Sequence, residues 1–320
     1  MRTIRQLLPL GAAVIVLLLL FRIWVPTFLS PENLVNLAQQ ISVNAILAMG
    51  MTMVILIGGI DLSVGALMAL VGTATVYLLA LEIPAAQSGA WAVLAVLAGL
   101  TLAAAFGAFH GLCAARTAMP PFIITLATML VARGLALSFN DGRPMRIPDS
   151  QEAFLAVGNG RLFDRLPVPV LVMTAVFVVM SVILHRTRFG QHLYAMGGNL
   201  EAARFTGIPL ARRTLAVYMI CSVLAAVAGM IHASQLYSAE PSSGVGFELN
   251  AIAAVVVGGT SFTGGVGSMP GTLIGAVIIG VLDKGLNQAG VRFSLQYIVK
   301  GLVILVAVYI DVRRRKGMSQ

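Results

Sequence analysis

Charged residues and cysteines are both scarce in this sequence. Only 10% of its 320 residues are charged and 58% are hydrophobic, whereas about a quarter of the residues in a soluble domain are charged. A single soluble core could not bury so much apolar surface and still present a polar exterior to water. The two cysteines, Cys113 and Cys221, lie in apolar runs, which argues against a disulfide framework and indicates two inert, small hydrophobic side chains.

Motifs for catalysis, metal binding and nucleotide binding are also missing. No GxxxxGK[ST] loop occurs, so the chain itself should not bind and hydrolyse ATP. Neither a metal-ligand cluster nor a Ser-His-acid arrangement is found among the four scattered histidines, which are His110, His185, His192 and His232. We therefore expect no catalytic residue, no metal site and no cofactor bound by this chain. The net charge of +9 is concentrated in particular connections and at the C-terminus, which is typical of a topology signal and not of nucleic-acid binding.

Long apolar runs are what the sequence has in abundance. A helix of about 20 apolar residues crosses the ~30 Å hydrocarbon core of a bilayer. Ten spans are predicted, at 7–25, 34–57, 62–81, 90–115, 120–138, 168–185, 215–234, 249–266, 270–286 and 294–311. Glycine and proline crowd the junction of the eighth and ninth, so either could be broken or re-entrant. The predicted fold class is an all-α integral membrane protein of about ten transmembrane helices, with residues 1–320 forming a single transmembrane domain.

The distribution of arginine predicts the orientation in the membrane. The connection 186–214 carries five arginines against the single acid Glu201, and residues 313–316 are all basic. The connection 139–167 carries four arginines matched by four acids. Since basic residues are in excess on the cytoplasmic side, we expect 186–214 and both termini to be cytoplasmic and 139–167 to lie outside.

Two Gly-Gly segments resemble each other and suggest an internal duplication. Residues 54–72 and 255–275 each contain an apolar run, a Gly-Gly pair, a short polar patch and a Gly-rich helix start. Duplicated halves with interrupted helices at matching positions are common in transporters. The glycines expected to have structural roles, because they allow close packing, are Gly58, Gly59, Gly65, Gly258, Gly259, Gly264 and Gly265.

Asp61 is the only charged residue between Glu32 and Glu82, and an acid in an apolar stretch is costly unless it is paired or hydrated. One interpretation is that Asp61 caps the third span by accepting backbone N–H groups. The other is that Asp61 and Ser63 line a pathway or a gate. Further candidates for the pathway are the hydroxyl residues Thr125, Thr128, Thr260 and Ser261, although hydroxyls in spans usually bond back to their own helix.

A short helix with both ends specified is predicted in the basic connection 186–214. Asn199 can serve as its N-cap, and Glu201 places a negative charge in the first turn. Gly207 can adopt the left-handed conformation that ends a helix, and Pro209 prevents its continuation. So short a helix is marginal alone, so it either rests against another surface or is an ordinary capped connector.

With these motifs, the sequence resembles the permease subunit of bacterial monosaccharide ATP-binding-cassette importers, the ribose, xylose and galactofuranose permease group. The nearest likeness within that group is to the galactofuranose type. The resemblance covers nearly the whole chain and rests on hallmarks in family order: GGIDLSVG at 58–65, PFIITL at 121–126, TRFG at 187–190, GGNLEAARFTGI at 197–208 and VVGGTSFTGGVGSMPGTLIG at 256–275.

The resemblance implies a permease domain in the bacterial inner membrane and a set of partners. Two permease subunits, identical or homologous, would pair in the membrane lipid, and a periplasmic binding protein would deliver the sugar. Two cytoplasmic ATPase subunits would bind Mg-ATP and dock on the short helix, whose coupling residues would be Asn199, Glu201, Ala202, Ala203, Arg204 and Gly207. Phe205-Thr206 stands where relatives often carry Leu-Ser, and this departure bears on the pairing with the ATPase.

Two alternatives for the function stay open. A self-sufficient secondary transporter would need its own coupling-ion site and no docking helix. A permease of similar architecture for branched-chain amino acids would need fixed charge or helix-end dipoles for a zwitterion. The candidate polar residues are mostly Thr, Ser and Asn, which favours a neutral sugar. A membrane enzyme is disfavoured because no catalytic constellation is found.

Overall fold

The computed structural model describes residues 2–84, 88–117 and 119–316. This part of the chain is almost entirely helical. Its α-helices are α1 (Arg2–Trp24), α2 (Pro31–Leu56), α3 (Val64–Leu79), α4 (Gly89–Arg116), α5 (Pro121–Ser138), α6 (Glu152–Asn159), α7 (Val168–Arg186), α8 (Arg188–Gly198), α9 (Leu200–Phe205), α10 (Leu210–Gln235), α11 (Phe247–Val257), α12 (Met269–Gln288) and α13 (Phe293–Lys316). A 3-10 turn, η2 (Phe139–Gly142), follows α5.

Two small antiparallel pairs of strands complete the described chain. Strand β1 (Met145–Arg146) pairs with β4 (Ser238–Ala239), with Met145 opposite Ala239. Strand β2 (Arg161–Leu162) pairs with β3 (Leu166–Pro167). The first pair ties the long connection after α5 to the connection after α10, so these two loops lie at the same end of the bundle.

Ten apolar helices correspond in order to the ten predicted spans. Seven are long and apolar enough to cross a membrane, namely α1, α2, α4, α5, α7, α10 and α12. The other three, α3, α11 and part of α13, are apolar but shorter. The prediction of an all-α integral membrane protein is therefore confirmed.

The eighth predicted span, 249–266, is wrong in length. Helix α11 ends at Val257, and residues 258–268 form turns before α12 begins. The physical reason is glycine: Gly259, Gly264 and Gly265 all have positive φ, near +87°, +85° and +73°, which an α-helix cannot accommodate. Residues 249–266 carry no charge, so they were counted as one span, although 258–265 consist of Gly, Thr, Ser and one Phe.

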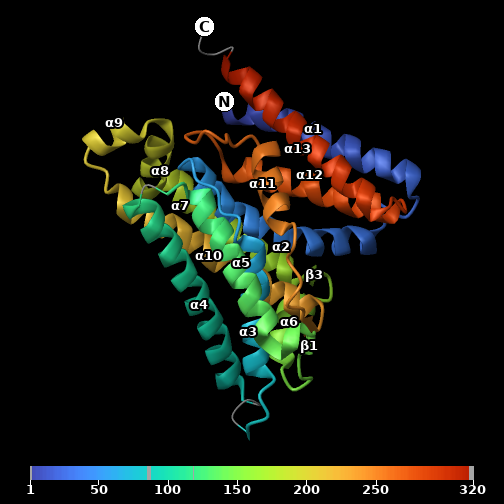
Figure 1. Cartoon of the computed structure of the whole chain (residues 1–320). Coiled ribbons are helices and arrows are strands. Elements are labelled where there is room, and N and C mark those ends of the chain that lie inside the picture. Colours follow the sequence, from blue (N-terminus) through green and yellow to red (C-terminus); the bar gives the residue numbers. More distant parts are fainter. Residues whose placement is uncertain (1, 85–87, 118, 317–320) are drawn as a thin grey trace.

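Helix α2 lies at the centre of the bundle (Figure 1). In its most apolar window 89% of the residues are buried, against 6% in α1, because α2 packs against α7, α10, α11 and α12. Helix α10 also packs closely on α4, where a side chain at Gly107 or Gly111 would collide with the backbone of Met219 or Leu215. Small residues that allow such contact are typical of membrane helix interfaces.

The connection 186–214, in which the sequence predicts one short helix, is nearly all helical. Helices α8 and α9 occupy its first part, and α10 already begins at Leu210 and not at 215. In Figure 1, α9 lies at the same end of the view as the start of α1 and the end of α13, and the end of α3 and the start of α4 lie at the opposite end. This arrangement agrees with the predicted topology, although which end faces the cytoplasm stays a prediction. The side chains of residues 313–316 lie outside the described residues.

Residues 240–246 enter the bundle as a deep loop. The Arg133 Nη1 atom, on α5, donates to the carbonyl oxygens of Pro241 and Ser243 at 2.7 and 2.6 Å. Gly244 lies against Gly65 at the start of α3, with no room between them for a side chain. Helix α11 therefore starts within the bundle, and its 11 residues span about 16 Å, roughly half of a hydrocarbon core.

Candidate functional site

The turn between α2 and α3 contains the fully buried carboxylate of Asp61. Its Oδ1 atom accepts from the Ser63 backbone N–H at 2.9 Å and from the Ser63 hydroxyl at 2.6 Å. Asp61 thus accepts a backbone N–H group at the start of α3, although the N-cap position itself belongs to Ser63. This is the geometry that the capping interpretation requires, and it uses only one of the two carboxylate oxygens.

The second oxygen of Asp61 faces His110 on α4. The Oδ2 atom lies 3.9 Å from His110 Nδ1, and both side chains are fully buried. Neither atom has a hydrogen-bond partner among the described residues. The other ring nitrogen, Nε2, lies 2.6 Å from the Thr128 hydroxyl. A carboxylate and an imidazole therefore meet inside the bundle, where a bilayer makes unpaired charge expensive.

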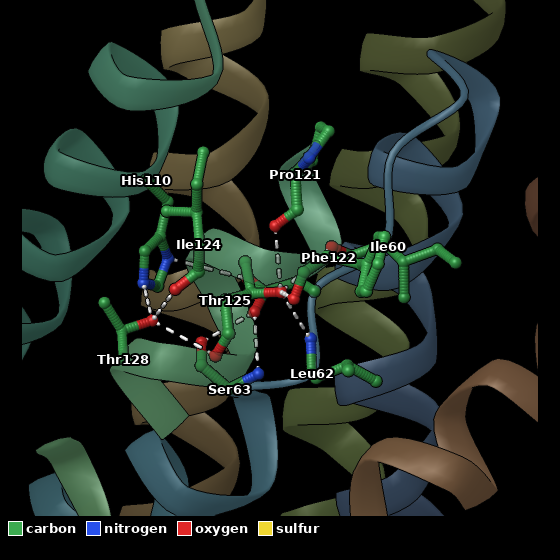
Figure 2. A network of polar contacts seen from close by, with 10 residues as sticks. Ile60, Leu62, Ser63, His110, Pro121, Phe122, Ile124, Thr125 and Thr128 are labelled. Carbon is green, nitrogen blue, oxygen red and sulfur yellow. Dashed lines mark hydrogen bonds and ion pairs between the residues drawn. The ribbon is translucent and has the colours of Figure 1, made fainter. Parts of the chain in front are cut away.

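Thr125 attaches α5 to the turn between α2 and α3 (Figure 2). Its hydroxyl lies 3.2 Å from the carbonyl of Ile60 and accepts the Leu62 backbone N–H at 3.1 Å. Thr128 lies one turn further along and bonds the Ile124 carbonyl of its own helix at 3.0 Å. The structure thus brings together four of the predicted pathway residues, which are Asp61, Ser63, Thr125 and Thr128.

Three members of this buried cluster were missed from the sequence. His110 was counted among scattered histidines, and Cys221 was interpreted as inert, yet its buried thiol lies within electrostatic reach of Asp61. Tyr218, also on α10, has its ring edge-on to His110 at 6.2 Å between centroids. These residues come from α4 and α10, far from Asp61 in sequence. The available signal was weak: a histidine inside an apolar run.

The other two pathway candidates, Thr260 and Ser261, lie in the turn after α11. Both are fully buried. The Ser261 backbone N–H donates to the Val266 carbonyl at 2.9 Å, which closes a tight turn. The Thr260 side chain packs on Gly267, where a Cβ atom would collide with it, and its hydroxyl has no partner in the described part of the chain.

The two Gly-Gly segments end their helices in the same way. After α2, Gly58 N donates to Ile55 O and Gly59 N to Val54 O, both at 2.9 Å. After α11, Gly259 N donates to Val256 O at 2.9 Å and Thr260 N to Val255 O at 3.1 Å. The two left-handed residues are Gly58 and Gly259, with φ of +78° and +87°. Both ends therefore have Schellman-type geometry, with the left-handed residue first in one Gly-Gly pair and second in the other, and the internal duplication stays a prediction.

The seven predicted structural glycines occupy two kinds of position. Gly58, Gly259, Gly264 and Gly265 have positive φ. A side chain at the other three would collide with a neighbouring group: the Tyr218 hydroxyl for Gly59, Gly244 and Glu248 for Gly65, and the Gly271 carbonyl for Gly258.

The two Gly-Gly turns meet each other and the end of α8. The Gly265 N–H donates to the Leu56 carbonyl at 2.9 Å, which joins the second turn to the end of α2. Gly197 lies so close to Leu56 O and Gly265 N that a Cβ atom would overlap both. The Tyr194 hydroxyl, on α8, donates to Gly267 O at 2.8 Å. Helix α8 therefore touches both turns at once.

Helix α9 follows directly and is capped as the sequence predicts. The Asn199 side chain accepts the Ala202 N–H at 2.9 Å, and Gly207 has a φ of +78°. Ala203 is buried, while Leu200 and Phe205 are 50% and 88% exposed. Glu201, Ala202 and Arg204 are also exposed. The short helix therefore has one buried residue and an exposed aromatic ring, and its docking on another protein stays a prediction.

Helix α8 is held on the bundle by side chains of α10. The Arg213 guanidinium donates from Nε to His192 Nδ1 at 3.1 Å and lies 5.4 Å from the centroid of the Phe189 ring. Burial raises the pKa of Tyr194 to about 12, so its hydroxyl stays protonated and keeps donating to Gly267 at physiological pH. No cluster of three or more metal-ligating acids, histidines or cysteines occurs among the described residues.

Comparison with known proteins identifies the family. Residues 33–308 match the family described as the permease component of branched-chain amino acid transport systems. The chain belongs to this family of transport-system permeases. The permease is 45% identical to the ribose import permease protein of Bacillus subtilis over 296 residues, which cover 92% of this chain and 89% of that protein.

Two further relatives show the same relationship over nearly the whole permease. The L-arabinose transport system permease protein of Escherichia coli is 34% identical over 302 residues, 94% of this chain and 89% of that protein. A probable ABC transporter permease protein of Sinorhizobium fredii is 35% identical over 307 residues, 96% of this chain and 89% of that protein. No solved structure matches this chain. The permease is therefore a multi-pass membrane protein and a transport subunit, not an enzyme.

Proposed function

We propose that this permease carries a monosaccharide, a pentose or a hexose, into the cytoplasm as the inner-membrane subunit of an ATP-binding-cassette importer. The relatives named for ribose and arabinose support a sugar over the amino acids in the family description. Ribose is the first candidate, and galactofuranose stays a prediction.

The observation that carries the proposal is the contact of α8 with both Gly-Gly turns. Gly197 lies against Leu56 and Gly265, while the exposed Phe205 stands one short helix away. A push on α9 by a cytoplasmic ATPase would therefore reach both turns through a rigid, closely packed backbone. Coupling between an ATPase and a transport pathway needs a packed element whose conformation is influenced from both places. A self-sufficient transporter would have no use for a packed connection between α9 and the two turns.

The turn at Asp61 is well placed to move when the ATPase acts on α9. Thr125 joins it to α5 and His110 joins it to α4, so a shift of the α2 end would move groups from several helices. The proposed partners are two ATPase subunits that bind Mg-ATP, a second permease subunit and a periplasmic sugar-binding protein. In this arrangement α9 and both termini are cytoplasmic.

Reconstitution tests the function directly. The permease, its ATPase and its binding protein are placed in proteoliposomes, and uptake of labelled ribose, arabinose, galactose and leucine is measured. We expect uptake of at least one monosaccharide, dependent on ATP and on the binding protein, and none of leucine. Uptake of leucine alone would favour the amino-acid alternative, and uptake driven by an ion gradient without ATP would favour a secondary transporter.

A further inference from the structure

The connection 139–167, which is predicted to lie outside, ends in a small hairpin at residues 161–167. Strands β2 and β3 pair in this hairpin, and the Arg165 N–H closes its turn by donating to the Leu162 carbonyl at 3.3 Å. The two central residues of the turn, Phe163 and Asp164, have positive φ values of 53° and 55°. Such turns favour Gly, Asn and Asp at both places, so Asp164 suits its position and Phe163 does not.

Phe163 is strained and exposed at the same time. A left-handed conformation is costly for a bulky side chain. Because 82% of the side chain is exposed, packing within the described chain does not offset that cost. Leu162 and Leu166, on either side of the turn, are 45% and 48% exposed. Backbone strain of this kind is concentrated at functional positions, so the aromatic tip indicates a contact with another molecule.

The base of the hairpin is fixed to α2 and α10. The Gly158 N–H, at the end of α6, donates to the Ser234 hydroxyl on α10 at 2.8 Å. The Gly158 carbonyl accepts from Gln39 Nε2 on α2 at 2.7 Å, and Asn159 Nδ2 donates to the Ser234 carbonyl at 2.6 Å. A Cβ atom at Gly158 would collide with α10. The tip therefore stands on a rigid support, which lowers the entropy lost when it binds a partner.

The residues around Phe163 fit a protein better than they fit lipid. Arg161 and Arg165 flank the turn and are exposed, and aromatic residues together with Arg are enriched where proteins bind each other. Asp164 lies beside Phe163 in the turn, so insertion of the tip into a bilayer would bring a carboxylate with it. Two basic residues against one acid make the tip complementary to an acidic surface. A lipid anchor would also gain nothing from the bonds to α2 and α10.

We propose that the hairpin 161–167 is the surface on which the periplasmic sugar-binding protein docks, with Phe163 in an apolar pocket of that protein and Arg161 and Arg165 facing acidic residues around it. The proposal rests on the proposed function, because it assigns a surface to one of the proposed partners. It gives each partner protein its own docking element: α9 for the ATPase inside and the hairpin for the binding protein outside.

Phe163→Asn separates docking from folding. Since Asn tolerates the left-handed conformation, the melting temperature of the purified permease should stay the same or rise, whereas a purely structural role of the ring predicts a fall. The affinity of the permease–ATPase complex in nanodiscs is measured for the binding protein that supports uptake in the reconstituted system. It should fall about tenfold or more, as expected when an aromatic anchor is removed.

Phe293→Asn is the matched control. Phe293 is another exposed aromatic residue, 70% exposed, at the start of α13, which is also predicted to lie at the outer side. This variant should bind the binding protein with wild-type affinity. An equal loss of affinity in both variants would mean that the hairpin has no special role, and would overturn the proposal.

Photochemical crosslinking identifies the molecule that contacts the tip. The photoreactive residue p-benzoylphenylalanine is placed at position 163 and, as a control, at position 205, because Phe205 is also highly exposed and is predicted to face the cytoplasm. Irradiation with the binding protein present should join that protein to position 163 and not to position 205. An adduct with lipid alone at position 163 would make the hairpin a membrane anchor and overturn the proposal. This measurement also decides the question if Phe163→Asn does not fold.

The docking surface and the proposed function can fail separately. If wild-type uptake of a monosaccharide requires the binding protein, but Phe163→Asn binds that protein as tightly as the wild type and position 163 does not crosslink to it, docking occurs elsewhere and the proposed function stands. If wild-type uptake requires no binding protein, the proposed function fails and the docking surface fails with it.

Discussion

The two carboxylate oxygens of Asp61 have different surroundings, and a role of this residue in a pathway or gate stays a prediction. Its Oδ1 atom accepts the Ser63 N–H as a capping group would, and its Oδ2 atom faces His110 at 3.9 Å. A residue that served only to accept the Ser63 N–H would not need a charge, since the amide oxygen of Asn can accept the same bond. Replacing the charge alone therefore separates the two roles.

We expect Asp61→Asn to reduce sugar uptake severalfold while membrane insertion and ATPase assembly stay intact. The amide keeps an acceptor for Ser63 but removes the negative charge that faces His110. Asp61→Ala also removes the acceptor and should lower the amount of assembled complex. Uptake and co-purification of the ATPase are measured for both variants. A fully active Asp61→Asn variant would contradict the gating interpretation and leave only the capping interpretation.

Thr125 is the residue through which α5 holds the same turn. Thr125→Val removes its bonds to Ile60 and Leu62 and leaves the Leu62 N–H without that acceptor, at a cost of about 1–3 kcal/mol. We expect a lower melting temperature of the purified permease in detergent. Thr174→Val is the control, because Thr174 is exposed and bonds only within its own helix. Equal melting temperatures would contradict the role of Thr125.

At the scale of elements, the contact of α8 with both turns is possible only because Gly197 has no side chain. A Cβ at Gly197 would overlap Leu56 and Gly265, whereas a Cβ at Gly198 meets no atom of the described chain within 4 Å. We therefore expect Gly197→Ala to abolish ATP-driven uptake and Gly198→Ala to preserve it. Uptake in cells with matched expression checks this. Normal uptake by Gly197→Ala would mean that the backbone contact is not used in coupling.

A related prediction concerns Gly207, just after the end of α9. Its φ of +78° is strained for a β-branched residue, and Gly207→Val should cost on the order of 1–2 kcal/mol locally. Since Phe205 lies just before this turn, the ring would be misplaced. We expect membrane insertion to survive and sugar uptake to fall, with fewer ATPase subunits co-purifying. If assembly and uptake are both normal, α9 is only a connector.

The whole molecule is expected to have one orientation in the membrane. Loop 139–167 lies outside and 186–214 inside if the basic connections are cytoplasmic. A cysteine at Ser150 should react with an impermeant thiol reagent in intact spheroplasts, and one at Thr206 should react only after lysis; both positions are exposed. The opposite pattern would reverse the topology and place α9 beyond reach of a cytoplasmic ATPase.

The sequence by itself determined the features that depend on neighbouring residues. Apolar runs of sufficient length predicted the ten spans, since a helix satisfies its own backbone in lipid. Cap residues predicted α9, because Asn199 and Gly207 act within two turns of chain. The predicted span 249–266 is too long because hydropathy does not report backbone conformation. The glycines after α11 adopt left-handed conformations, and a helix cannot continue through them.

Only the tertiary structure decided which distant groups meet. His110 reaches Asp61 because α4 packs beside the turn after α2, and Gly197 touches Leu56 and Gly265 because three separate segments converge. Arg133 holds the loop 240–246 inside the bundle through bonds that join positions more than 100 residues apart. Such contacts depend on helix packing, which is set by side-chain shape across many helices together. No local pattern of residues encodes it.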